Sequence, residues 1–437
     1  MQVPGKQLNI AMLTVHSSPI GELGTQDTGG MSVYIRELAS ELGRRGHRVD
    51  IYTRLEEFRR DRIVDLSENV RLIHLKAGTN GYVHKWALHP HLADFWRELE
   101  TYRAEHGLDY DLVHSHYWLS GLVGNWARER WDVPHIILFH TLGALKNITV
   151  EAEREPDFRL AAERMLVETC DWILAPTEME RDHLIRYCGA SPGKIGVVPC
   201  GVNLEVFRSM DRRKARERLG LHGDDAVVLF VGRFASLKGI ERLLAAVPHL
   251  QEHRRLRLII IGGNGTATPE CRELQRLSEA YGIGQAVTFA GRVPQEHLPP
   301  YYSAADVLVV PSYYESFGLV ALEALACGTP VVATRVGAMS SILREGVNGR
   351  VVPDGSPRSL ARGIDEVLAS SRGLAAGDVR ATILRFSWTH VASAMIEQYR
   401  AVLKREREAS GSIPRAPEIA TRGYPRRAST CGRTARA

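Results

Sequence analysis

The feature that most constrains this chain is a regular alternation of short apolar stretches with amphipathic ones. Leu8–Val15 is apolar enough to form a buried strand, and a polar, glycine-rich loop follows it. Apolar residues then recur at helical spacing from Met31 to Leu42, and Gly46 suits the end of that helix. Arg48–Tyr52 is the next predicted strand. A strand, a helix and a strand in this order form a βαβ unit with parallel strands.

The same alternation recurs in two series. Further strands of the first series are predicted at Leu112–Ser115, His135–Phe139, Trp172–Ala175 and Lys194–Val198. Pro199–Asn203 breaks the periodicity. Strands of the second series are predicted at Ala226–Val231, Leu256–Ile261, Ala286–Phe289, Val307–Val310 and Pro330–Ala333. The sequence therefore predicts an α/β protein of two doubly wound, Rossmann-like units that face each other across a cleft. Ligands of such sheets bind at the carboxyl ends of the strands.

These patterns divide the chain into four predicted segments. Residues 1–203 and 204–385 form the two Rossmann-like domains. Residues 386–407 include the amphipathic stretch Trp388–Arg405, which we expect to form a helix that crosses back over the first domain. Residues 408–437 form a basic tail with almost no large apolar side chains, so the tail is predicted to be disordered.

The net positive charge is concentrated at the carboxyl end. The chain carries +5, whereas residues 404–437 contain nine Lys or Arg and three Glu and therefore carry +6. The rest of the chain is nearly neutral, at −1, and this argues against nucleic acid as a partner. We expect a solvated tail, and attachment to an anionic surface is the alternative.

Composition also indicates the compartment. The apolar runs are far shorter than the ~18 residues that a membrane span needs, so no transmembrane segment is predicted. Ile10–Val15 lacks the length and the cleavage site of a signal peptide. The six cysteines form no CxxC pair and have no metal-ligand spacing with a histidine. We expect a cytoplasmic protein with reduced cysteines.

The first candidate binding motif is Asp27–Met31, at the start of the first predicted helix. Gly29 and Gly30 let the backbone approach a ligand closely, and a helix N-terminus offers free N–H groups to an anion. The motif is not the GxGxxG fingerprint, so a nicotinamide cofactor is not indicated. The alternative interpretation is an ordinary tight loop.

The second motif, Val231–Gly239, places two cations after a predicted strand. Arg233 and Lys238 stand five residues apart where a helix opens. Arg can bind two phosphate oxygens at once and Lys adds a point charge, so the pair favours a pyrophosphate group. A solvated pair of cations at a strand end is the alternative.

The third motif is the most specific. Pro311–Ala324 holds two carboxylates, Glu315 and Glu323, with seven residues between them. Glu323 lies two turns into a predicted helix among apolar residues, where a carboxylate is unfavourable unless it has a partner such as sugar hydroxyls. An ion pair between helices is the alternative for Glu323. Asp109–Asp111 spells DxD, but a strand follows directly, so Asp111 is predicted to cap or turn the chain and no metal site is predicted.

Together, the Gly29–Gly30 loop, the Arg233…Lys238 element and the Glu315-x7-Glu323 frame resemble the motifs of the retaining GT-B glycosyltransferases of family 4. The resemblance implies a GT-B fold and transfer of a sugar from a nucleoside diphosphate sugar, expected to be a UDP-sugar, without a further cofactor. Asp27–Tyr34 and His114–Gly121 look most like two subgroups, the D-inositol-3-phosphate glycosyltransferases and the sucrose-phosphate synthases. Phe139–Asn147 mixes features of both. A small phosphorylated polyol or sugar acceptor, such as inositol 3-phosphate or fructose 6-phosphate, is therefore expected.

The resemblance also implies residue roles on the donor side, in domain 204–385 and across the cleft. The implied donor contacts are Gly29, Gly30, Arg233 and Lys238 at the phosphates, Glu323 at the ribose, Glu315 at the transferred sugar and Arg292 near the base. His140 would hydrogen-bond the donor sugar, with a satisfied core histidine as the alternative. The implied catalytic residues are His140, Glu315, Arg233 and Lys238.

The acceptor is expected to bind domain 1–203. The resemblance places its phosphate at Lys85, Tyr117, Thr141 and Arg159, and its ring hydroxyls at His16, Asp27, Thr28 and Ser32. Lys85 follows a glycine-containing loop, Tyr117 and Thr141 each follow a strand end, and Arg159 begins a helix. The alternative is that Lys85 and Arg159 are solvated surface charges.

Two other functions stay open at this point. A lipid or polysaccharide acceptor would need a basic, apolar patch on the first domain, for which Arg59–Ile63 is a weak candidate. An NDP-sugar 2-epimerase shares the two-domain architecture, but the Glu315…Glu323 frame with Lys238 argues against it. The donor base and sugar, the acceptor, assistance by a divalent ion, the role of the tail and the oligomeric state are not determined by the sequence.

Overall fold

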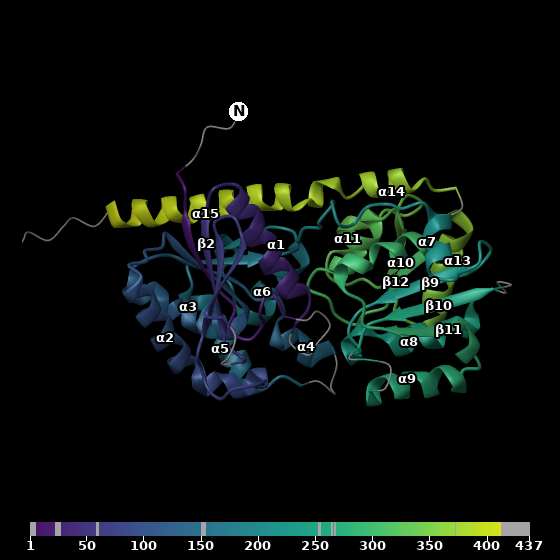
Figure 1. Ribbon diagram of the computed structural model, residues 1–437, viewed down its shortest axis with the longest axis horizontal. Coiled ribbons are helices and arrows are strands. Elements are labelled where there is room, and N and C mark those ends of the chain that lie inside the picture. Colours follow the sequence, from purple (N-terminus) through teal and green to yellow (C-terminus); the bar gives the residue numbers. More distant parts are fainter. Residues whose placement is uncertain are drawn as a thin grey trace, which may run out of the picture.

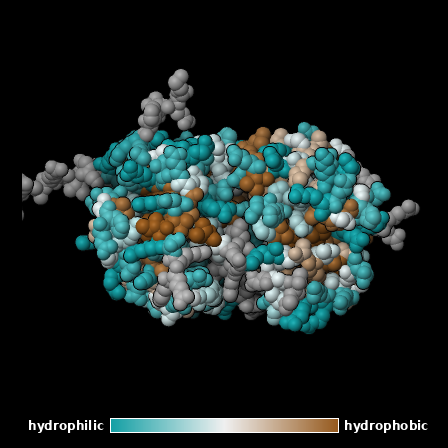
Figure 2. All heavy atoms as spheres, in the orientation of Figure 1, coloured by the Kyte–Doolittle hydropathy of each residue, from teal (hydrophilic) through white to brown (hydrophobic). Residues whose placement is uncertain are grey.

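The computed structural model describes residues 6–21, 28–57, 61–149, 154–251, 255–263, 265, 268–371 and 373–411. Two separate sheets lie beside each other, each covered by helices (Figure 1). Figure 2 shows hydrophilic residues over much of one face of both halves, with patches of hydrophobic residues among them. Buried hydrophobic side chains form a core in each half. The two series of strands predicted from the sequence therefore form two separate Rossmann-like units.

The first sheet has eight strands in the order β3-β4-β2-β1-β5-β6-β7-β8. Their bounds are β1 Asn9–Leu13, β2 Arg48–Arg54, β3 Ile63–Ser67, β4 Val70–Leu75, β5 Leu112–His116, β6 His135–Leu138, β7 Trp172–Ala175 and β8 Ile195–Val197. Only the edge strand β3 is antiparallel to its neighbour, β4, among the pairs that the structure describes. The helices of this half are α1 Gly30–Arg44, η1 Lys85–His91, α2 Leu92–Glu105, α3 Tyr117–Trp131, α4 Gly143–Thr149, α5 Asp157–Thr169, α6 Glu178–Cys188 and η3 Pro192–Lys194, where η marks a 3₁₀ helix.

The second sheet is parallel throughout the described pairs, in the order β11-β10-β9-β12-β13-β14. Its strands are β9 Ala226–Val231, β10 Leu256–Ile261, β11 Val287–Gly291, β12 Val307–Val310, β13 Val331–Ala333 and β14 Gly349–Val351. The longer helices of this half are α7 Arg212–Arg218, α8 Ile240–Ala246, α9 Pro269–Ala280, α10 Pro299–Ala304, α11 Leu319–Ala326, α12 Met339–Ile342, α13 Pro357–Ser371 and α14 Ala376–Ala381. Short 3₁₀ turns are η4 Ser236–Lys238, η5 Val247–His249, η6 Gly284–Ala286, η7 Gln295–His297 and η8 Leu384–Phe386.

The chain passes between the halves twice, and the two passages lie together. Val202, on the way out, forms a parallel bridge with Ser387, on the way back, and its N–H donates to the carbonyl oxygen of Phe386 at 2.8 Å. Helix α15, Trp388–Gly411, then lies along α1 of the first half (Figure 1). Residues 408–411, which the sequence assigned to the tail, are helical, and residues 412–437 lie outside the described part of the chain.

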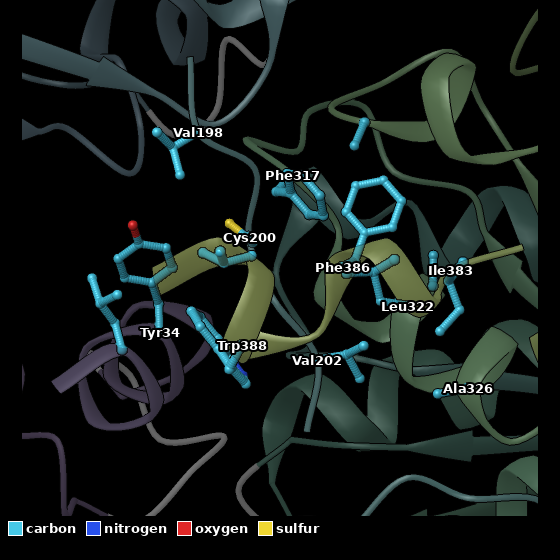
Figure 3. Close-up of a cluster of buried hydrophobic side chains, with 14 of the residues drawn as sticks. Tyr34, Val198, Cys200, Val202, Phe317, Leu322, Ala326, Ile383, Phe386 and Trp388 are labelled. Atoms are coloured by element: carbon cyan, nitrogen blue, oxygen red, sulfur yellow. The ribbon is translucent and has the colours of Figure 1, made fainter. Parts of the chain in front are cut away.

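A hydrophobic cluster fills the region around these passages (Figure 3). Trp388 packs edge-on against Tyr34 of α1 at a ring-centroid distance of 5.4 Å, and Phe386 packs edge-on against Phe317 at 6.2 Å. Side chains of the first half, of the second half and of the returning segment therefore share one core.

The hairpin of β3 and β4 was not predicted. Strand β3 alternates exposed and half-exposed residues at the edge of the sheet, so it lacks the apolar run that identifies the buried strands. Strand β11 ends two residues later than expected, at Gly291, which brings Arg292 directly after the strand.

Candidate active site

The glycine loop of the first half faces the second half. Gly29 is the N-cap of α1, and a side-chain carbon built at this position would lie 3.9 Å from Nε of Arg233. A carbon at Gly30 would lie 3.4 Å from Leu319, the first residue of α11. The structure thus brings the first two sequence motifs, which belong to different halves, close to each other. Thr28 and Ser32 are buried beside this loop, whereas Asp27 lies outside the described residues.

Lys238 and Glu315 form an ion pair at the carboxyl edge of the second sheet. Lys238 Nζ lies 2.6 Å from Glu315 Oε1, and the hydroxyl of Ser312 donates to the same oxygen at 2.9 Å. Gly239 makes this approach possible because its φ of +65° is left-handed and a side-chain carbon there would meet the carbonyl oxygen of Pro311 at 2.3 Å. The second and third motifs therefore meet in one charged pair.

Glu323 is buried on α11 without a cation against it among the described contacts. Its Oε2 accepts from the Tyr302 hydroxyl at 2.7 Å, and its Oε1 accepts from Nε2 of Gln295 at 3.0 Å. Burial raises the pKa of Glu323 above its ordinary value, and these two hydrogen bonds oppose the rise. The ion-pair interpretation is thus wrong: neutral donors hold this carboxyl. Each oxygen keeps a further lone pair for a ligand hydroxyl.

Two histidines form a neutral pair at the ends of β5 and β6. His140 has a φ of +60°, which is uncommon for a residue with a side chain, and its Nε2 lies 3.0 Å from Nδ1 of His116. Burial lowers the pKa of His140 to about 3 and that of His116 well below its usual value. One proton is therefore shared between the facing nitrogens, and His140 is neutral near pH 7. No role was predicted for His116, although the motif His114–Gly121 contains it.

The predicted phosphate contacts gather around a carboxylate that sequence reasoning missed. Arg159 is completely buried, with Nη1 2.8 Å from Glu155 and Nε 2.7 Å from Glu163. Its Nη2 donates to the carbonyl oxygen of Thr141 at 2.8 Å and to the Thr141 hydroxyl at 3.0 Å. The guanidinium also lies over the ring of Tyr117, 4.8 Å from its centre. The alternative of a solvated Arg159 is therefore wrong.

Glu155 is the centre of this cluster. It is 2 % exposed, and its carboxylate pairs with Lys146 as well as with Arg159 and accepts from the Trp86 indole at 3.1 Å. Burial alone would raise the pKa of Glu155, but Arg159, Lys146 and Lys85 lower it to about 2. Lys85, half-buried at the start of η1, is thus a neighbour of the same group. The pair Glu155–Pro156 before a predicted helix was the available sequence signal.

The remaining predicted residues also have definite places. The ring of His16 lies 4.5 Å from that of Tyr117, and the hydroxyls of Ser17 and Ser32 are 2.7 Å apart. Arg292 is exposed at the carboxyl end of β11, on the same sheet edge as Arg233. His16 follows β1 and Arg292 follows β11, so both lie beyond the carboxyl ends of strands.

Asp111 of the DxD sequence has a structural role, but it bonds to a distant segment and does not cap or turn the chain as predicted. Its Oδ2 accepts from the backbone N–H of Asn9 at 2.8 Å and its Oδ1 accepts from Lys6 at 3.0 Å. Among the described residues, no three His, Cys, Asp or Glu side chains come together as a possible metal site. Within the same residues, no helix is both long and apolar enough to span a membrane.

Two protein-family models match the chain. The model described as "Glycosyltransferase Family 4" matches residues 28–206, and the one described as "Glycosyl transferases group 1" matches residues 211–376. A D-inositol 3-phosphate glycosyltransferase of Catenulispora acidiphila is 41% identical over 89% of this chain and 94% of its own length. One from Xylanimonas cellulosilytica is 39% identical over 91% of this chain and 97% of its own length.

Solved structures show the same architecture. The sucrose-phosphate synthase from Thermosynechococcus elongatus has a TM-score of 0.83 and 34% identity, covering 91% of this chain and 100% of its own. Anabaena HepE in complex with UDP-glucose has a TM-score of 0.70 at 18% identity, covering 90% of this chain and 100% of its own. The two Rossmann-like units thus define a GT-B fold, a class of two-domain sugar-transferring enzymes. The chain belongs to the family 4 glycosyltransferases.

Proposed function

We propose that this glycosyltransferase moves a sugar, with retention, from an NDP-sugar, expected to be a UDP-sugar, to inositol 3-phosphate. The names of the relatives at 39–41% identity, which align over about nine-tenths of the chain, support this acceptor. In the proposal, residues 204–385 bind the donor and residues 1–203 bind the acceptor, with α15 returning to the acceptor domain. Membership of the glycosyltransferases removes the epimerase alternative.

The proposed donor site is supported by the ion pair of Lys238 with Glu315 and by the position of Arg233 opposite Gly29 of the other half. Arg233 and Lys238 bind the diphosphate, and the glycine loop leaves room for it beside the N-terminus of α1. Glu315 contacts the transferred sugar, Glu323 the ribose and Arg292 the base. When the glycosidic bond breaks, negative charge grows on the diphosphate, and the two fixed cations stabilise it.

We assign the acceptor phosphate to the cations around Glu155. Lys85 and the hydroxyls of Tyr117 and Thr141 supply contacts to this phosphate beside the pairs that Arg159 and Lys146 form with Glu155. Ring hydroxyls of the acceptor meet His16, Asp27, Thr28 and Ser32. A phosphate is a stronger ligand for such a site than a neutral hydroxyl, because its hydrogen bonds are charge-assisted.

Retention follows from attack on the same face of the sugar that the diphosphate leaves. Glu315 pairs with Lys238 and lies beside the diphosphate contacts, so it is not assigned as a nucleophile. The leaving phosphate accepts the proton of the acceptor hydroxyl, and His140, neutral at pH 7, hydrogen-bonds the donor sugar. The scheme uses no metal or cofactor because the cations of the chain balance the developing charge.

Fructose 6-phosphate is the second candidate acceptor. It is favoured by the likeness to the sucrose-phosphate synthase from Thermosynechococcus elongatus, which at 34% identity extends over the whole of that chain. A cytoplasmic location is proposed for either reaction, since the five described cysteines are free thiols and buried.

Both proposals are tested by one transfer screen. The purified protein is incubated with radiolabelled UDP-, GDP- and ADP-sugars and with inositol 3-phosphate, inositol, fructose 6-phosphate or fructose. We expect transfer to a phosphorylated acceptor, preferred over its dephosphorylated form by several kcal/mol. Equal use of both forms would contradict the proposal and favour a lipid or polysaccharide acceptor.

A further inference from the structure

Loop Ser312–Gly318, which joins β12 to α11 and carries Glu315, is attached to the opposite half of the molecule by both neighbours of Glu315. The hydroxyl of Tyr314 accepts from the backbone N–H of Leu142 at 3.3 Å. The hydroxyl of Ser316 donates to Oε2 of Glu180 at 2.6 Å. Leu142 and Glu180 both belong to the first half, so the loop spans the junction between the halves.

Glu180 is a buried carboxylic acid near the N-terminal end of α6. It lies in the first turn of α6, where its backbone N–H donates to the Thr177 hydroxyl at 3.0 Å. The residue is only 3 % exposed. Its second carboxyl oxygen, Oε1, is buried without a hydrogen-bond partner in the described part of the chain. Burial, together with the nearby Glu163, raises the pKa of Glu180 to about 7, although the hydrogen bond from Ser316 opposes the rise.

A buried carboxyl with this much desolvation is unfavourable, so its contact with Ser316 needs an explanation. The Ser316 hydroxyl lies one residue from Glu315, whose own carboxylate is fixed by Lys238 and Ser312. Because Glu180 and Ser316 come from different halves, their hydrogen bond forms only when the halves are together. The position of Glu315 is thereby coupled to the first half.

We propose that Glu180 is a positioning residue: through its hydrogen bond with Ser316 it holds Glu315 in place for transfer when the two halves meet. The inference rests on the proposed contact between Glu315 and the transferred sugar. Glu180 itself touches neither substrate in this proposal, and its effect is on the sugar-transfer step rather than on binding of the nucleotide.

The kinetic test uses Glu180→Ala, Ser316→Ala, their double variant and Glu180→Gln. Each alanine variant is expected to lower kcat by about tenfold, the usual effect of one lost hydrogen bond, while the Kd for UDP stays unchanged. The double variant should lose no more than either single variant. Glu180→Gln should keep most of the wild-type kcat, because the amide oxygen of the glutamine side chain accepts the hydrogen bond from Ser316. Glu178→Gln, at an exposed carboxylate in the same helical turn, is the matched control and should match the wild type.

A second measurement does not depend on the substrate. Hydrogen–deuterium exchange of residues 313–317 in the unliganded protein should become faster in Glu180→Ala and Ser316→Ala, and should not change in Glu178→Gln. Unchanged exchange and kcat in a folded Ser316→Ala variant would overturn the inference, as would single effects that multiply in the double variant. If the wild type transferred no sugar while the exchange result held, the proposed function would fail and the attachment of the loop would stand.

Discussion

At the scale of single residues, Arg233 and Lys238 are the sharpest test of the donor site. Both act on the charge that develops on the diphosphate, so each change to alanine is expected to remove about 2–4 kcal/mol of transition-state stabilisation. The double variant should lose less than the sum, because the two cations share one charge. The measurement is kcat/KM at low donor concentration. Arg213→Ala, on the exposed face of α7, is the control, and near-wild-type activity of either single variant would show the assignment to be wrong.

The two cations of the acceptor cluster should behave differently. Lys85 is half-buried, so Lys85→Ala is expected to weaken the preference for a phosphorylated acceptor about tenfold without loss of fold. Arg159 is fully buried between Glu155 and Glu163, so Arg159→Ala leaves the buried Glu163 without its cation and removes one cation from Glu155, and it should lower the free energy of unfolding by about 3–5 kcal/mol. Acceptor kinetics and urea unfolding measure the two effects. An Arg159→Ala variant as stable as the wild type would contradict the buried arrangement.

Glu180 gives a prediction for pH. Because burial raises its pKa from 4.5 to about 7, the folded protein binds a proton here between these values that the unfolded chain does not. The contribution of this proton to the free energy of unfolding is complete below pH 4.5. It is lost as the pH rises to 7, and the loss is up to ~3 kcal/mol. Glu180→Gln should therefore make the free energy of unfolding less dependent on pH over this interval in urea titrations. Glu178→Gln should keep the wild-type slope, and an identical slope in Glu180→Gln would contradict the raised pKa.

At the scale of elements, α15 is the part of the carboxyl end that the fold needs. Its Tyr399 hydroxyl lies 2.8 Å from Nδ1 of His114, and its Gln398 accepts from the Trp172 indole at 2.9 Å. A chain ending after Glu408 keeps these contacts and is expected to keep wild-type transfer activity. A chain ending after Ala392 exposes the buried face of the first half and should melt lower or aggregate. Scanning calorimetry and the transfer assay distinguish the two, and loss of activity in the longer chain would show that the tail contributes.

The comparison of expectation with structure also belongs to this scale. Buried parallel strands such as β9 and β12 were predictable because a continuous apolar run needs no partner to be recognised. The half-exposed edge strand β3 has no such signature. The ion pair of Lys238 with Glu315 was not predicted, although the sequence places both residues after the ends of strands in one parallel sheet. Partners that depend on packing between distant segments, such as Ser316 for Glu180, carry no local pattern and could not be predicted.

At the scale of the whole molecule, one hydrophobic cluster includes strands of both sheets and the start of α15. We therefore expect the halves to unfold together, in a single calorimetric transition. Trp388→Ala should lower the free energy of unfolding by about 3–5 kcal/mol, because the Trp388 ring packs against Tyr34 and fills the space left by Gly201. In this variant, the two halves should unfold in two separate calorimetric transitions. Two well-resolved transitions in the wild type would show that the shared core does not couple them.

The bridge between Val202 and Ser387 gives the second half the topology of an insertion. The first half contains strand β1 and packs against the last described helix, α15. The chain enters the second half and returns from it at neighbouring points. Because the two connections are adjacent, we expect the second half to move relative to the first by rotation about an axis through the bridge, without sliding. The same adjacency means that the second half could be exchanged for that of a relative at one junction, provided that the replacement supplies the apolar residues of the shared core.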